Sequence, residues 1–402
     1  MPEICLYSMV PLVRAAEISS LEGNYAAIGA FNVNIRAQAE GILEGLSRAE
    51  APGIIQASRG ACTFQGGADK ILYIVLDVMD KMGVDDLPLA LHLDHGTVET
   101  AKDCVDSGFS SVMIDASKLD FDENIAATNE VAEYAHRMGV SVEGEYGGLG
   151  GIEEDVEHEK VTLSDPLRVP LFLRDSGADA LAITYGTSHG PNKNIKGRDI
   201  EKALRIQIVR DSYAALTAYH MNLSKFLVGH GSSTVPEELV ARINEYGGRL
   251  KVTGGVPVYK ITEARNAGIR KFNIDTDIRL VITATVRKYF HDHPGVEDES
   301  EALRLIKDVF DGKLEAVDIK TGETIPPEEM IDPRLYLNPL DKELLREDYR
   351  GTDMEELMML IRNNVADHVE MLVRDVFNSA GLAPKVERVS MEQMANLYKQ
   401  LD

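Results

Sequence analysis

The sequence contains 402 residues, of which 44% are hydrophobic, and its formal net charge is 42 − 66 = −24. This apolar content excludes a globally disordered chain, and the strong negative charge argues against nucleic acid or an anionic membrane as a partner. Three cysteines, Cys5, Cys62 and Cys104, lie far apart without a CxxC pair, which argues against a disulfide framework or a cysteine-based zinc site. Because the sequence shows neither a signal-peptide pattern nor a membrane-length apolar run, we expect a soluble, cytoplasmic protein.

Short apolar segments alternate with amphipathic segments of helical spacing along the first two thirds of the chain. The apolar segments predict eight strands at 27–31, 53–58, 89–94, 111–115, 140–146, 180–185, 225–230 and 271–274. One of the intervening segments, 199–219, predicts a single long helix. This alternation is typical of a parallel α/β sheet, and eight units within about 250 residues predict a (β/α)8 TIM barrel. A doubly wound open sheet is the alternative, but no GxGxxG follows the first strand.

The alternation stops after Tyr289, and the remaining sequence has a different character. Residues 291–332 are charged and rich in turn dipeptides, with one helix predicted at 299–310. Apolar residues at helical spacing predict a long helix over 353–380 that ends near Gly381. We therefore divide the chain into a barrel catalytic domain, 1–290, and a C-terminal helical extension, 291–402, which packs on the barrel or on a neighbouring subunit.

Polar residues stand at the ends of the predicted strands, which is where barrel enzymes carry their chemistry. One polar strand end is ordinary, but strands in such sheets are otherwise nearly continuous apolar runs, so a ring of them predicts a site. The residues at or just after the eight strand ends are Asn34, Ser58, Asp94, His95, Asp115, Glu143, Glu145, His189, His230, Asn273, Asp275 and Thr276.

Three histidines follow three different strands: His95, His189 and His230. Each alone is most simply a hydrogen-bonded structural residue, but three at one barrel mouth predict the imidazole ligands of a catalytic zinc ion, to which Glu145 could add a carboxylate. His92 lies inside its strand and is interpreted as a core or supporting residue. The other six histidines are predicted to lie on the surface.

Loops after the last two strands, 229–233 and 273–276, offer backbone N–H groups and hydroxyls for a phosphate. Lys193 and Arg334 could supply positive charge. The glycine-rich loop 147–160 carries Glu153 and Glu154. It is either a plain solvated loop, which is the commoner case, or a lid that delivers a carboxylate base.

Several segments together resemble the class II, zinc-dependent ketose-bisphosphate aldolases, and most closely the fructose-1,6-bisphosphate aldolases. They occur in the family's order, at compatible spacing, from about residue 27 to about residue 339: LALHLDHG, SVMIDAS, EGEYGGLGGIEED, GTSHG, GHGSS, KFNIDTDIR and DPRLYLNP.

The resemblance implies that His95, His189 and His230 bind the catalytic Zn²⁺. Glu145 would hold the metal in an alternative, buried position, and Asp115 would be a nearby carboxylate. A monovalent cation, Na⁺ or K⁺, is a further expectation.

The resemblance also assigns the proton transfers. Asp94 would handle the proton of the C4 hydroxyl. Glu154 or Glu153 would move the C3 proton of the triose phosphate; an inserted residue in this loop relative to some members keeps both open. The implied substrate contacts are Asn34, Ser58, Gly190, Lys193, Gly231, Ser233, Asn273, Asp275 and Thr276.

Arg334 resembles an arginine that reaches the second phosphate from a neighbouring subunit, which implies a homodimer or homotetramer. The family often has HGGSG where this chain has HGSST at 230–234, so side chains stand in part of a backbone cradle. The implied reaction is the reversible cleavage of fructose 1,6-bisphosphate into dihydroxyacetone phosphate and glyceraldehyde 3-phosphate in glycolysis and gluconeogenesis.

Three other functions are alternatives to this one. An aldolase for tagatose or sedoheptulose bisphosphate would have the same metal site. An aldolase that forms a Schiff base needs a lysine at an interior strand end, whereas Lys271 is predicted to open its strand. A catalytically silent binding protein would have no use for the full set of ligands together with Asp94.

Overall fold

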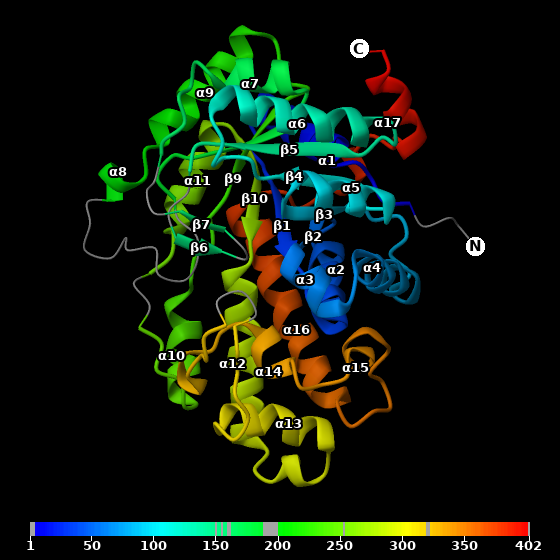
Figure 1. Ribbon diagram of the computed structural model, residues 1–402, viewed down its shortest axis with the longest axis vertical. Helices are drawn as coiled ribbons and strands as arrows, with labels where there is room; N and C mark the ends of the chain where they lie inside the picture. The colour runs from blue at the N-terminus through cyan, green and yellow to red at the C-terminus, as the bar shows by residue number, and fades with distance from the viewer. Residues whose placement is uncertain are drawn as a thin grey trace.

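The computed structural model describes residues 5–148, 151–153, 156–158, 162–187, 200–251, 254–318 and 322–400. Eight parallel strands close into a barrel in the order β1-β10-β9-β8-β5-β4-β3-β2 (Figure 1). The predicted (β/α)8 barrel is confirmed. The strands are β1 Ile28–Asn32, β2 Gly53–Ser58, β3 Leu89–Gly96, β4 Ser111–Ile114, β5 Ser141–Tyr146, β8 Ala180–Ile183, β9 Phe226–Gly229 and β10 Ile269–Ile274. A short antiparallel hairpin, β6 Gly151–Glu153 and β7 Val156–His158, follows β5.

Helices surround the barrel and bury the outward faces of the strands. They are α2 Arg36–Arg48, α3 Arg59–Gln65, α4 Ala68–Met82, α5 Val98–Asp106, α6 Phe121–His136, α7 Val169–Ser176, α8 Ile200–Ala203, α9 Ile206–Ala218, α10 Glu237–Glu245, α11 Val258–Ala267 and α12 Thr276–Asp292. The helix α1 Met9–Leu21 instead packs against the inward-facing residues of the strands. Several begin directly at a strand end, where a side chain caps the helix: Ser58 Oγ accepts from the N–H of Ala61 at α3, and Thr97 forms a capping box with Thr100 at α5.

The single helix predicted over 199–219 is wrong, because the chain breaks between α8 and α9. Leu204 is buried there, and Arg205 leaves the helical region with φ −87° and ψ 74°. The N–H of Arg205 donates instead to the carbonyl of Tyr185, at 2.7 Å. This contact ties the break to the end of β8, which local spacing cannot reveal.

The C-terminal extension packs on the barrel through α16 Glu355–Met371, which runs alongside α2 (Figure 1). Gly41 and Gly45 allow this close approach, because a Cβ at either position would lie 2.6 Å from a backbone oxygen of α16. The long helix predicted over 353–380 ends earlier, since a π turn, η3 Leu372–Val376, follows α16. The remaining elements are η1 Val296–Asp298, α13 Glu301–Phe310, η2 Pro327–Glu329, α14 Pro333–Leu337, α15 Lys342–Arg346, η4 Ala383–Lys385 and α17 Met391–Tyr398.

Two histidines predicted to lie on the surface are partly buried. The ring of His136 stacks on Tyr398 of α17, with 3.7 Å between ring centroids, and its Nε2 lies 3.0 Å from an oxygen of Asp179. His368 is 10% exposed and lies 3.9 Å from Asp277. Both serve to pack helices together. None of the described helices is both long and apolar enough to cross a membrane.

Candidate active site

The end of β3 turns two consecutive side chains toward the same place. Neighbouring residues of a strand normally point to opposite faces. His95, however, has a φ of 52°, and the register of β3 against β4 shifts between Leu93 and Gly96. Asp94 and His95 are both buried, and His95 Nε2 lies 3.9 Å from Asp94 Oδ1. A left-handed backbone costs a non-glycine residue about 1–2 kcal/mol, and here that strain accompanies a pair of chemically useful groups.

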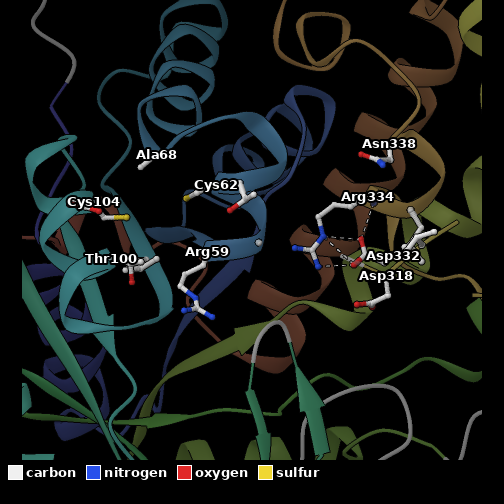
Figure 2. Close-up of a pocket in the computed structure, with 15 residues that line it drawn as sticks. Arg59, Cys62, Ala68, Thr100, Cys104, Asp318, Asp332, Arg334 and Asn338 are labelled. Carbon is white, nitrogen blue, oxygen red and sulfur yellow. Dashed lines mark hydrogen bonds and ion pairs between the residues drawn. The ribbon is translucent and has the colours of Figure 1, made fainter. Parts of the chain in front are cut away.

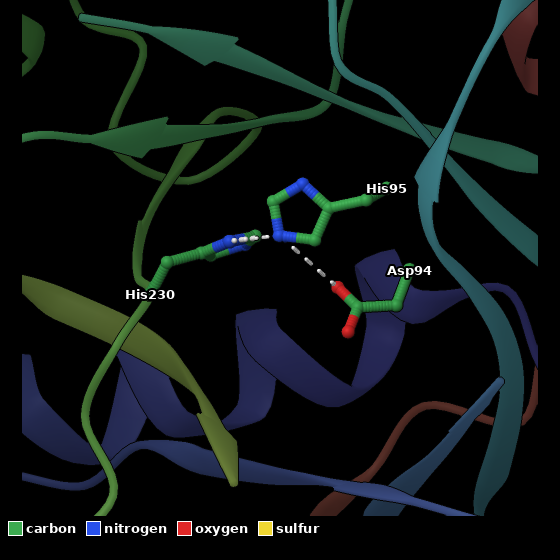
Figure 3. A group of neighbouring side chains, drawn as sticks. All are labelled: Asp94, His95 and His230. Carbon is green, nitrogen blue, oxygen red and sulfur yellow. Dashed lines mark hydrogen bonds and ion pairs between the residues drawn. The ribbon is translucent and has the colours of Figure 1, made fainter. Parts of the chain in front are cut away.

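His230, just after β9, meets His95 at the mouth of the barrel. His95 Nε2 and His230 Nδ1 are 3.2 Å apart (Figure 3). Two Zn–N bonds of about 2.0–2.1 Å at a tetrahedral angle would separate their nitrogens by about 3.3–3.4 Å. The two imidazoles are therefore spaced like neighbouring ligands of one zinc ion.

The opposite nitrogen of each imidazole faces a carboxylate. His230 Nε2 lies 2.8 Å from Glu143 Oε1, and His95 Nδ1 lies 3.4 Å from Asp115 Oδ2. Asp115 is itself fixed, because its Oδ1 accepts from both the N–H and the hydroxyl of Ser117. Carboxylates in this position orient metal-binding histidines and set the ring tautomer. The arrangement leaves Nδ1 of His230 and Nε2 of His95 to face the metal.

Glu145, at the end of β5, adds a buried carboxylate to the cluster. Its Oε2 lies 3.8 Å from His95 Nδ1, and neither oxygen accepts a hydrogen bond from any residue that the structure describes. Burial, with the negative charge of Asp115, raises the pKa of Glu145 well above its usual value. A buried acid of this kind is costly unless a cation compensates it.

The pKa of His95 also indicates that this cluster stabilises a positive charge. Burial lowers the pKa of the imidazole, but the negative charge of Asp94, with Asp115 and Glu145, outweighs burial and raises the pKa to about 10. Two possible ligand groups share this histidine: Asp94, His95 and His230, and His95, Asp115 and Glu145. The residues present therefore fit a divalent cation, and their nitrogen and oxygen donors suit zinc.

Asp94 is held by three side-chain amides from three other strands. Asn32 and Gln56 donate to its Oδ2 at 3.2 and 3.1 Å, and Asn273 donates to its Oδ1 at 3.0 Å. Gln56 also donates to Asn32 Oδ1 at 2.6 Å. The carboxylate is thus aimed by the barrel itself, as a positioned acid or base requires.

A second layer of polar residues lies one pleat deeper in the barrel. Of these, Glu143 was predicted as a strand-end residue and His92 as a core or supporting residue, whereas Asn32, Gln56 and Lys271 were not predicted to belong to the site. Each of these precedes a predicted site residue by two positions, which puts the pair on one face of its strand. That spacing was the available signal. The five residues are Asn32, Gln56, His92, Glu143 and Lys271.

Lys271 does not open its strand as predicted, because it is the third residue of β10 and its side chain lies inside the barrel. Its Nζ donates to Glu143 Oε2 and to Asn273 Oδ1, both at 2.8 Å, and lies 3.4 Å from His92 Nε2. Burial and the charge of Lys271 lower the pKa of His92 well below its usual value, and its Nδ1 contacts Ser111 Oγ at 2.8 Å. An ammonium paired in this way is a poor nucleophile.

The residues of this site all lie within the part of the chain that matches a known protein family. The family model described as "Fructose-bisphosphate aldolase class-II" matches residues 16–381. The chain belongs to this family.

Relatives agree with the assignment to the class II aldolases. The "Fructose-bisphosphate aldolase" of Giardia intestinalis is 43% identical over 278 residues, which cover 69% of this chain and 82% of the relative. The "Fructose-bisphosphate aldolase, plasmid" of Cupriavidus necator is 37% identical over 392 residues, covering 92% and 94%. The crystal structure of the YdjI aldolase from Escherichia coli K12 superposes with a TM-score of 0.59 at 20% identity, over 95% of this chain and 100% of that one, which supports the fold. As a class II aldolase, the chain is a carbon–carbon lyase.

The structure brings several other predicted residues of the aldolase to the barrel mouth. The side-chain amide of Asn34 is buried, and neither its nitrogen nor its oxygen has a hydrogen-bond partner among the described residues. Ser233 is buried after β9, and Gly231 has a φ of 61°. Asp275 precedes α12 and pairs with Arg279 at 2.7 Å, next to Thr276. Glu153 ends β6. His189, Gly190, Lys193 and Glu154 lie outside the described residues.

Arg334 lies in a cavity of its own chain. The cavity has a volume of about 520 Å³ and is lined by residues that include Asp332, Arg334 and Arg59, the first residue of α3 (Figure 2). Asp332 holds the guanidinium at 2.7 Å; burial opposes the charge of Asp332, but Arg279 and Arg334 keep the pKa of this carboxyl well below its usual value. Sequence analysis missed Arg59. The role of Arg334 in a neighbouring subunit stays a prediction.

Proposed function

We propose that this aldolase cleaves fructose 1,6-bisphosphate reversibly into dihydroxyacetone phosphate and glyceraldehyde 3-phosphate, with Zn²⁺ as its cofactor. The observation that carries the proposal is the pair of imidazole nitrogens 3.2 Å apart, His95 Nε2 and His230 Nδ1, beside Asp94. His95 and His230 would hold the metal, with His189 as the expected third histidine. Glu145 and Asp115 supply the nearby carboxylates.

When bound, Zn²⁺ would act as a Lewis acid on the substrate carbonyl and stabilise the negative charge that cleavage leaves on the three-carbon product. Asp94 takes the proton from the C4 hydroxyl during cleavage and returns it during condensation. Its three amide donors keep the carboxylate aimed at one point. Glu154 or Glu153 would protonate the three-carbon product at C3.

Two groups of residues would position the phosphates, whose binding supplies the orientation that the reaction needs. Gly231 and Ser233, with residues 273–276, would receive the phosphate of the triose end. Ser58 and the cavity containing Arg334 would receive the other phosphate. Arg59 lines the same cavity and adds a second guanidinium to it, alongside the carboxylates of Asp103, Asp318 and Asp332.

The substrate has close competitors. Tagatose and sedoheptulose bisphosphates would use the same metal site, so the ratio of kcat/KM values for the three sugars decides among them. The homodimer or homotetramer, the role in glycolysis and gluconeogenesis, and the monovalent cation, Na⁺ or K⁺, are proposed with the function on the same resemblance. The cytoplasmic location expected from the sequence is proposed with them.

The test is a coupled aldolase assay on fructose 1,6-bisphosphate, with and without a chelator, followed by added zinc. We expect the chelator to abolish cleavage and zinc to restore it. Cleavage that is indifferent to chelators, together with inactivation by borohydride in the presence of substrate, would contradict the zinc mechanism and indicate a Schiff base.

A further inference from the structure

We propose that Lys271 is a positioning residue that holds the metal ligand His230 and the acid/base Asp94 in their working orientations. Lys271 lies on β10 and is fully buried inside the barrel. Two chains of hydrogen bonds start from its ammonium group. One reaches His230 through Glu143, and the other reaches Asp94 through Asn273, which also contacts His230. The inference rests on the proposed zinc chemistry, because it concerns how that site is built.

The first chain runs through Glu143. Lys271 Nζ donates to Glu143 Oε2 at 2.8 Å, and the other oxygen of the same carboxylate lies 2.8 Å from His230 Nε2. Nε2 of His230 also lies 3.1 Å from Asn273 Nδ2, but the contact with Glu143 is shorter. A carboxylate only accepts hydrogen bonds, so the shorter contact favours the tautomer with the proton on Nε2. The ring then presents the lone pair of Nδ1 toward His95, which is the tautomer that binds a metal.

Lys271 keeps Glu143 in place as its counterion and as a hydrogen-bond donor. Glu143 is fully buried, and a buried carboxylate without a cationic partner is strongly unfavourable. Without the ammonium, the side chain of Glu143 would lose both its counterion and one of its two anchors. His230 would then lose the contact that fixes its tautomer and ring orientation.

The second chain runs through Asn273. Its Oδ1 accepts from Lys271 Nζ at 2.8 Å, and its Nδ2 donates to Asp94 Oδ1 at 3.0 Å. An amide has one accepting end and one donating end, and an ammonium can only donate. Lys271 therefore fixes which end of Asn273 faces Asp94. The remaining contact of the ammonium, to His92 Nε2 at 3.4 Å, completes its three donors.

The experiment compares Lys271→Met with Lys260→Met. Lys260 is also buried, at 1% exposure, and pairs with Glu263 at 2.8 Å, but it lies on α11 outside the barrel interior. Zinc affinity is measured by chelator competition on the zinc-loaded protein, alongside kcat, KM and thermal unfolding. We expect Lys271→Met to lower zinc affinity and kcat by about 10–100-fold each. The change in KM should be smaller, because Asn273 is the one proposed substrate contact that loses its anchor. Lys260→Met should change only stability.

A second variant separates the two chains and covers a poorly folded single variant. The double variant Lys271→Met/Glu143→Gln removes both charges, and the amide oxygen of the new side chain can still accept from His230. We expect it to recover zinc affinity but not kcat, because Asn273 remains unanchored.

Two results would overturn the proposal: a Lys271→Met protein with the zinc affinity and kcat of Lys260→Met, or a double variant with wild-type kcat. If the wild-type protein shows no zinc-dependent cleavage, the proposed function fails instead. The two failures are distinguishable because zinc affinity is read without turnover.

Discussion

The rings of His95 and His230 meet nearly at right angles, at 83°, with Nε2 of one 3.2 Å from Nδ1 of the other. They are 135 residues apart in the chain, and each has a carboxylate on its far side. Two imidazole nitrogens at this distance repel unless a cation lies between them or one carries a proton. The carboxylates around His95 raise its pKa, because they stabilise a positive charge at this place. A bound metal ion would supply this positive charge without a proton on His95.

Asp94→Ala should retain zinc and lose cleavage. The metal ligands His95 and His230 remain, but the group that accepts the C4 hydroxyl proton is gone, so we expect kcat to fall by about 10²–10⁴-fold. Zinc content by elemental analysis and turnover in the coupled assay check this. The control is Asp106→Ala, which removes an exposed acid at the end of α5 whose carboxylate accepts a hydrogen bond from the hydroxyl of Tyr134. Normal turnover in Asp94→Ala would refute the role.

Arg334→Ala should mainly weaken substrate binding. A charged hydrogen bond to phosphate contributes about 1.5–3 kcal/mol, so we expect KM for fructose 1,6-bisphosphate to rise by about 10–100-fold. Fructose 1-phosphate lacks the second phosphate, and its KM should not change in the variant. An equal effect on both substrates, or none on either, would argue against the cavity as the second phosphate site.

The strands of the barrel could be predicted because both of their faces are buried, which leaves continuous apolar runs in the sequence. The break between α8 and α9 could not, because Leu204 fits the helical spacing of its neighbours and the break depends on the carbonyl of Tyr185. The end of α16 at Met371 could not be predicted either, because Leu372, Val376 and Phe377 continue its apolar spacing through the π turn. Gly381, which the sequence marks as the stop, lies after the π turn and donates its N–H to the carbonyl of Ala49 at the end of α2.

The residues of the site also differ in whether the sequence could predict them. Residues at strand ends could be predicted because a polar group that ends an apolar run is conspicuous. The contacts of the layer beneath them could not be predicted, because a polar residue inside a strand does not reveal its partner on another strand. Lys271 and Glu143 are 128 residues apart, and only closure of the barrel shows that they form an ion pair.

Gly45→Ala should destabilise the protein although alanine is the better helix former. Alanine would gain about 0.8–1.0 kcal/mol of helix propensity. Its Cβ, however, would lie 2.6 Å from the backbone oxygen of Ala366 and 2.9 Å from Cβ of Val369, and such overpacking costs typically about 1–3 kcal/mol. Thermal unfolding should show a lower midpoint, whereas Ser47→Ala on the exposed side of α2 should not. A more stable Gly45→Ala protein would show that α16 can shift freely.

Asp179→Asn should destabilise the protein at neutral pH and much less in acid. Asp179 is 3% exposed; burial raises the pKa of its carboxyl, but His136, with Lys225 and the N–H of Val142, outweighs burial and lowers the pKa below 3.8. Because the pKa is lower in the folded state, the carboxylate stabilises the fold above the unfolded-state value and loses this effect as pH falls through the folded-state pKa.

We therefore expect Asp179→Asn to reduce the free energy of unfolding by about 1–3 kcal/mol at pH 7. The difference from wild type should narrow as pH falls from about 5 toward 3. Denaturant unfolding across this range measures it, and limited proteolysis should show earlier release of α17, since Tyr398 stacks on His136. Asp175→Asn, at an exposed carboxylate that pairs with Arg174, is the control. A gap that stays constant with pH would mean that the ionised carboxylate of Asp179 is not what holds this end of the barrel together.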